Sequence, residues 1–225
     1  MNGTSSATPV TVGVIALLLE ANPALTWRDV KHILASTAWQ IDAARAPVGI
    51  VLSNGTYTAE PGWTTKAVGF NFHNWYGFGM VDASAAVNMA RTYTAGQLGT
   101  FVDTGFISSG ALNLSIRDNS VVGASSTLTV PINPVHVIEA VQISVTATHP
   151  FTGDLAIELT SPAGTRSVLK TGDGGFGGPD LNGMVLLSNA FYGENPAGIW
   201  TIKVVDVAPA DVGTLTNWQI RVFGH

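Results

Sequence analysis

The apolar run at residues 10–19 limits the fold of this chain more than any other stretch of its sequence. Its residues are apolar on nearly every face of a helix, and such a helix is buried on all sides. The run is well short of the roughly 20 apolar residues that a membrane-spanning helix needs. No Lys or Arg precedes it, which argues against a secretory signal. We therefore predict a helix at the centre of a folded domain and no membrane span.

The residues directly before this run suit a nucleophile at the start of a helix. The first N–H groups of a helix lack partners, and its dipole favours negative charge, as an oxyanion requires. We predict that Ser5 is the nucleophile and that its N–H binds the oxyanion. Gly3 and Thr4 are predicted to contribute to substrate binding, since glycine lets a substrate backbone approach closely. Thr4 and Ser5 also suit a helix cap, and Pro9 is tolerated in a first turn. The alternative is an ordinary capped core helix that contains a serine by chance.

Two further helices are predicted downstream. Thr26, with Asp29 three residues later, gives a start like a capping box, and apolar residues recur at helical spacing from Val30 onward. A last helix is predicted over about 83–91. Residues 41–74 are rich in Gly, Asn, Pro and Thr, and we predict loops and short strands there.

The pattern changes near residues 92–105, from helical spacing to alternating, β-branched runs bounded by Gly, Pro, Asn and Asp. Their short and even spacing predicts an antiparallel sandwich or jelly roll. The predicted strands cover residues 127–132, 137–146, 154–160, 167–170, 184–187, 200–205 and 218–223.

Composition excludes some classes of function. The formal net charge is −5 and basic residues are scattered, which argues against nucleic-acid binding. There is no cysteine, so disulfides and cysteine metal sites are excluded. Low charge with many Thr, Ser, Gly and Asn is compatible with a secreted bacterial protein. Calcium is the one possible cofactor, because Ca²⁺ prefers oxygen ligands and several aspartates lie in or near loops: Asp154, Asp173, Asp180 and Asp206. The default interpretation is that these carboxylates are solvated or cap turns.

Several motifs resemble subtilisin-like serine proteases of the kexin and furin type. In the N-terminal part they are the Gly-Thr-Ser-x-Ala-x-Pro block at 3–9, residues 22–38, and the Tyr-Gly-x-Gly-x-x-Asp-Ala turn at 76–83. Residues 149–225 resemble the P domain, or Homo B domain, that follows the catalytic domain in these proteases. The P-domain motifs are His149, Gly153-Asp154-Leu155, Leu159-Thr160-Ser161-Pro162, Gly193-Glu194-Asn195-Pro196, Val204-Val205-Asp206 and Gly213-Thr214-Leu215-Thr216-Asn217-Trp218.

This resemblance implies a fold and a function. Residues 1–95 are expected to be an α/β fragment, the C-terminal part of a subtilisin-like doubly wound domain. Residues 96–225 are expected to be the P domain, an all-β jelly-roll sandwich. The implied activity is that of a secreted, bacterial serine endopeptidase that forms an acyl-enzyme at Ser5 on a protein or peptide substrate.

The family's catalytic Asp and His and its oxyanion-binding Asn precede the nucleophile, and none stands before Ser5 here. We therefore predict that the chain alone is inactive and that its partner is the N-terminal part of the catalytic domain. Without that partner we expect the first ninety or so residues to be unstable, while the β domain folds by itself. None of the histidines is predicted to replace the base: His32, His73, His136, His149 and His225 are assigned structural roles or belong to the β domain.

Two other interpretations remain open at this point. The chain could be a non-enzymatic binding or accessory module whose β-sandwich recognises a protein or surface. It could also complement a separate polypeptide that carries the other half of the catalytic domain. Reading the coding DNA upstream of Met1 for Asp, His and Asn blocks distinguishes these from a protease.

Overall fold

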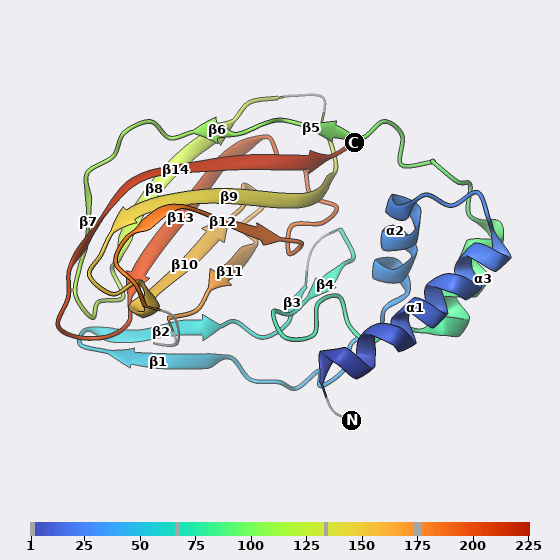
Figure 1. The fold of residues 1–225 in the computed structure, drawn as a ribbon, viewed down its shortest axis with the longest axis horizontal. Coiled ribbons are helices and arrows are strands. Elements are labelled where there is room, and N and C mark those ends of the chain that lie inside the picture. Colours follow the sequence, from blue (N-terminus) through green and yellow to red (C-terminus); the bar gives the residue numbers. More distant parts are fainter. Residues whose placement is uncertain (1–2, 66–67, 133–134, 173–176) are drawn as a thin grey trace.

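The computed structural model describes residues 3–65, 68–132, 135–172 and 177–225. Three helices gather at one end of the molecule and a β-sandwich fills the other (Figure 1). The helices are α1 (Thr4–Ala21), α2 (Trp27–Thr37) and α3 (Ala83–Thr92). Between α2 and α3 the chain forms small hairpins that run back toward the sandwich. This segment connects the two ends of the molecule.

Helix α1 begins earlier than expected. Its N-cap is Gly3, whose φ of 99° is a conformation that glycine adopts readily, and no side chain caps the helix. The predictions that Thr4 or Ser5 caps the helix and that Pro9 lies in its first turn are therefore wrong. Pro9 lies inside the helix. The hydroxyl of Thr8 donates to the carbonyl of Thr4 at 2.8 Å, one turn earlier in the helix.

Only one face of α1 is buried. Val14 and Leu18 pack in a cluster that α2 and α3 complete. Val10 is 71% exposed, and Val12 and Leu17 are also exposed. Within the described residues, α2 and α3 lie against a single face of α1, so the burial on all sides that the apolar run predicts is not reached by this chain alone.

By length and composition α1 could also cross a membrane, with a mean hydropathy of 1.4 over 18 residues. The apolar run at residues 10–19 underestimates the length of this helix, because the helix extends beyond the run on both sides. The core helix of a soluble protein has the same properties, so this feature alone does not assign the chain to a membrane.

Helices α2 and α3 begin with the side-chain caps that their sequences favour. In α2, the hydroxyl of Thr26 accepts from the N–H of Asp29 at 3.3 Å, and the Asp29 carboxylate accepts from the N–H of Thr26 at 2.8 Å. This confirms the predicted capping box. In α3, the Asp82 carboxylate accepts from the N–H of Ala85 at 2.8 Å. The turn before α3 therefore also fixes where the helix starts.

Two antiparallel sheets form the sandwich. One has the strand order β11-β10-β13-β8, and the other β12-β9-β14-β5, with β6 and β7 also paired to β14. Trp200 and Trp218, one from each sheet, are fully buried between them together with Phe191. The strands are β5 (Val102–Asp103), β6 (Ile107–Ser108), β7 (Leu114–Ile116), β8 (Ala124–Val130), β9 (Ile138–Thr148), β10 (Leu155–Thr160), β11 (Arg166–Lys170), β12 (Leu181–Ser188), β13 (Gly198–Asp206) and β14 (Gly213–Gly224), with a 3-10 turn at Thr152–Asp154.

All seven strands predicted for the second half are confirmed in position, and the antiparallel sandwich is confirmed as the architecture. The three short strands β5, β6 and β7 were not predicted, because runs of two or three residues carry no readable alternation.

The segment predicted as loops and short strands forms two hairpins. One joins β1 (Val48–Leu52) to β2 (Gly55–Glu60), and the other joins β3 (Thr64–Thr65) to β4 (Asn71–Phe72). Leu52 and Tyr57 of the first hairpin pack on Ala156 and Val205 of the sandwich. Those two residues alternate with core residues along their strands, so the hairpin covers the outer face of the four-stranded sheet. No parallel strand pairing occurs among the described residues, so the α/β character expected of residues 1–95 is limited here to helices and antiparallel hairpins.

Candidate active site

Ser5 lies in the first turn of α1 with its side chain exposed to solvent. The carbonyl of Gly3 accepts from the N–H groups of Ser6 at 3.1 Å and Ala7 at 3.3 Å. The N–H groups of Thr4 and Ser5 precede these bonds and point out of the helix end, where its dipole is positive. This end can stabilise an oxyanion, as the sequence predicts, and Gly3, Thr4 and Ser5 are brought together there.

The histidines of the chain are engaged away from Ser5. His32 Nδ1 lies 3.0 Å from the Tyr192 hydroxyl, and His149 Nε2 lies 3.3 Å from a buried Asp206 oxygen. His73 is fully buried, with Nδ1 accepting from the N–H of Trp75 at 3.0 Å. His136 is exposed in the sandwich, and His225 contacts Glu139. Within the described residues, none of them has a contact with Ser5.

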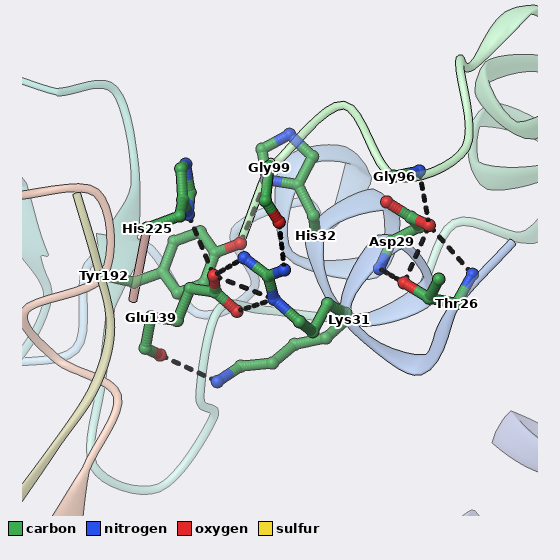
Figure 2. A network of polar contacts seen from close by, with 10 residues as sticks. Thr26, Asp29, Lys31, His32, Gly96, Gly99, Glu139, Tyr192 and His225 are labelled. Atoms are coloured by element: carbon green, nitrogen blue, oxygen red, sulfur yellow. Dashed lines mark hydrogen bonds and ion pairs between the residues drawn. The ribbon is translucent and has the colours of Figure 1, made fainter. Parts of the chain in front are cut away.

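A buried ion pair joins the helices to the sandwich (Figure 2). Arg28 of α2 donates from Nε to both carboxylate oxygens of Glu139 in β9, at 3.1 and 3.0 Å, and also from Nη2. Its Nη1 donates to the carbonyl of Gly99 at 2.7 Å. His225 Nδ1 lies 2.9 Å from the same carboxylate. Burial raises the pKa of Glu139, but the hydrogen bonds from Arg28 and His225 outweigh it, so the net shift of that pKa is downward.

Two more α2 side chains reach the sandwich beside this pair. Lys31 Nζ donates to the backbone carbonyl of Glu139 at 2.7 Å and to Asn189 Oδ1 at 2.9 Å. Burial lowers the pKa of Lys31. Burial also lowers the pKa of His32, whose ring contacts Tyr192 (Figure 2). One helix thus contributes three successive polar anchors, Arg28, Lys31 and His32, to a single interface.

The sequence missed this junction. Its members come from distant parts of the chain; Arg28 and Glu139, for example, are 111 residues apart. The available signal was the acidic Glu139 inside the otherwise apolar run Ile138-Glu139-Ala140-Val141, because a buried charge in a strand requires a partner.

Among the described residues, two of the aspartates weighed for calcium already have hydrogen-bond partners on His149. Asp206 is buried with His149, where burial raises its pKa, and Asp180 accepts from the N–H of His149 at 2.9 Å. Asp173 lies outside the described residues. Across the parts of the chain that the structure describes, no group of three or more His, Asp or Glu could hold a metal ion.

Two family models match this chain. The subtilase family matches residues 1–79, and the proprotein convertase P-domain matches residues 138–222. The chain therefore belongs to the subtilisin-like serine proteases that carry a P domain. The first match contains Ser5 and the second contains Glu139, so the junction described above joins the two family segments.

Individual relatives place it among bacterial and animal members of that class. It is 32% identical to the extracellular serine protease of Aeromonas sobria over its whole length, which is 42% of that protein. It is 35% identical to human proprotein convertase subtilisin/kexin type 5, with 99% of this chain and 12% of that protein aligned. The crystal structure of the A. sobria serine protease superimposes with a TM-score of 0.89 and 33% identity, over all of this chain and 44% of that one. The chain thus spans less than half of the relatives it matches.

Proposed function

We propose that this chain supplies the nucleophile, one oxyanion donor and the P domain of a subtilisin/kexin-type endopeptidase. The observation that carries the proposal is the position of Ser5 in the first turn of α1, inside the segment that matches the subtilase family. In the complete enzyme the Ser5 hydroxyl attacks the scissile carbonyl of a protein or peptide substrate and forms an acyl-enzyme. The Ser5 N–H binds the oxyanion, and Gly3 and Thr4 flank the substrate backbone.

The remaining catalytic groups come from a part of the enzyme outside these residues. A histidine acts as base and then as acid, an aspartate orients it, and an asparagine is the second oxyanion donor. We propose that this part packs around the exposed apolar side chains of α1, which include Val10, Val12 and Leu17. The chain by itself is then inactive. In subtilisin, the system from which this figure comes, loss of the triad histidine alone lowers kcat by about 10⁶-fold.

The P domain is proposed to stabilise the catalytic part by holding α2. Arg28, Lys31 and His32 reach the sandwich from that helix, and the proposed boundary between the two domains lies near residue 95. The similarity to an extracellular Aeromonas protease supports a secreted, bacterial enzyme.

The test compares two adjacent serines in an enzyme that joins this chain to its upstream catalytic region. S5A is expected to lower the kcat for hydrolysis of a peptide substrate by about 10⁶-fold. S6A, one position along the same exposed turn, is the matched control and should retain most activity. Residues 1–225 by themselves should show no hydrolysis. Activity that survives S5A, or S6A and S5A variants that are equally impaired, contradicts the proposal. A joined protein that hydrolyses no peptide at all favours a non-enzymatic binding module.

A further inference from the structure

A polar cavity lies where the second hairpin region meets the edge of the sandwich, and the proposed peptidase chemistry does not use it. Its volume is about 380 Å³. One wall comes from residues near the hairpins and the other from the ends of β11 and β12. The residues that matter are Glu60, Asn74 and Trp75 on the first wall and Ser167, Leu187 and Asn189 on the second.

Glu60 gives this cavity a buried negative charge. The residue is 3% exposed, and Oε1 accepts one hydrogen bond, from the N–H of Gly62 at 3.0 Å. The nearest histidine nitrogen, Nε2 of His73, is 3.9 Å away and has no hydrogen-bond partner within the described residues. No lysine or arginine of the described part of the chain pairs with Glu60. A buried carboxylate without a cation is costly, and a cationic ligand would offset that cost.

The cations of the surrounding elements are engaged elsewhere. Lys31 donates to Glu139 and Asn189, and Lys170 donates to two backbone carbonyls at 2.9 and 2.8 Å. Arg166, next to the cavity wall, pairs with Glu158. Among the residues that the structure describes, lysines and arginines lie around this site, but none of them is directed to Glu60.

The rim of the cavity suits the stem and head of a long basic side chain. Trp75 is 52% exposed, and its ring already lies 4.5 Å from the guanidinium carbon of Arg45. Aromatic faces attract such cations, and apolar rims accommodate the methylene stems of lysine and arginine. Leu187, which is also exposed, supplies an apolar rim on the opposite wall.

The walls also suit a polypeptide backbone. Strands β11 and β12 are the terminal strands of their sheets, each with a single neighbour in the sheet order. Terminal strands present unpaired N–H and C=O groups, which extended peptides use when they bind beside a sheet. A free small cation would leave these groups unused, so a peptide segment fits the site better.

We propose that this cavity binds the arginine or lysine side chain of an extended polypeptide segment, with Glu60 as the anion that receives it. The site is separate from Ser5 and does not depend on the proposed peptidase activity. The acidic balance of the chain, −5 in formal charge, favours a basic partner as well.

The test uses the 225-residue chain and two blocked tripeptides, acetyl-Gly-Arg-Gly-amide and its citrulline analogue, which has the same shape without the charge. Saturation-transfer NMR should show at least tenfold tighter binding of the arginine peptide. E60Q should remove that preference, and E20Q, which neutralises an exposed carboxylate on α1, should preserve it. Equal binding of the two peptides, or an E60Q variant that still prefers arginine, overturns the proposal.

Two further arms keep the result interpretable. L187R places a cation at the cavity wall of the chain itself, so it should block the arginine peptide even if E60Q folds poorly; unchanged binding by L187R counts against the site. Propylguanidine, which has the charge without a peptide backbone, should bind more weakly than the tripeptide. If it binds equally well, the site takes small cations and the polypeptide ligand is wrong.

Discussion

The ion pair between Arg28 and Glu139 provides a quantitative test of how the helices are held. In R28M the methylene stem is retained, but the Glu139 side chain, 3% exposed, loses its guanidinium. Removing one partner of a buried pair costs about 3–5 kcal/mol. Because His225 still contacts the Glu139 carboxylate, we expect the lower end, about 3 kcal/mol. For a chain of this size that lowers Tm by about 6–12 °C.

The control is an ion pair of the same chemistry on the surface. Arg221 and Asp103 are each 32% exposed, and such pairs contribute about 0–1 kcal/mol, so R221M should change Tm little. Differential scanning calorimetry of both variants at pH 7 measures the difference. If R28M lowers Tm no more than R221M, burial does not strengthen this pair and the junction is not held electrostatically. An R28M/E139M double variant should recover part of the loss, since it leaves no unpaired charge.

Three further predictions follow from individual positions. The partners of Glu139 lower its pKa from about 4.5. Its contribution to stability is therefore full above that value and is lost as pH falls through the lower, folded-state pKa. E139Q should flatten the acid side of a profile of Tm against pH. G79A should cost more than ~2 kcal/mol in urea unfolding, because its φ is 129° and a Cβ would lie 2.4 Å from the Trp39 carbonyl oxygen, whereas G13A, with no atom within 4 Å, should gain ~0.5–1 kcal/mol. L17Q should reduce aggregation measured by light scattering while changing stability by less than about 0.5 kcal/mol, since Leu17 is exposed. Each prediction is contradicted by one outcome. These are a loss of stability in G13A equal to that in G79A, a profile of Tm against pH that E139Q leaves unchanged, and light scattering that L17Q leaves unchanged.

Features that depend on neighbours in the chain could be predicted from the sequence. The capping box of Thr26 and Asp29 needs two residues three positions apart, and the structure has it. The strands of the sandwich follow from alternation within short runs of residues, such as those that contain Trp200 and Trp218 and place their side chains in the core. The Ser5 block was readable for the same reason, since its chemistry lies in consecutive residues.

Features that depend on distant partners could not be predicted in this way. The apolar pattern of α1 indicates that the helix prefers burial. It does not indicate which elements are present to cover Val10 or Val12. Glu139 and Glu60 are both buried carboxylates, yet Arg28 lies beside one and the described residues place no lysine or arginine beside the other. Sequence periodicity contains no information on that difference, because it arises from contacts across the fold.

The position of β14 has a consequence for how the sandwich is assembled. This strand pairs with β9 along most of its length and also with β5, β6 and β7, and its Arg221 reaches Asp103, 118 residues earlier. Until residues 213–224 are synthesised, β9 lacks its main neighbour and the three short strands have nothing to pair with. Such long-range pairing slows folding and leaves an apolar strand edge open to other chains during synthesis. The step most exposed to misassembly is therefore the addition of β14, which comes after the other strands of the sandwich have been synthesised.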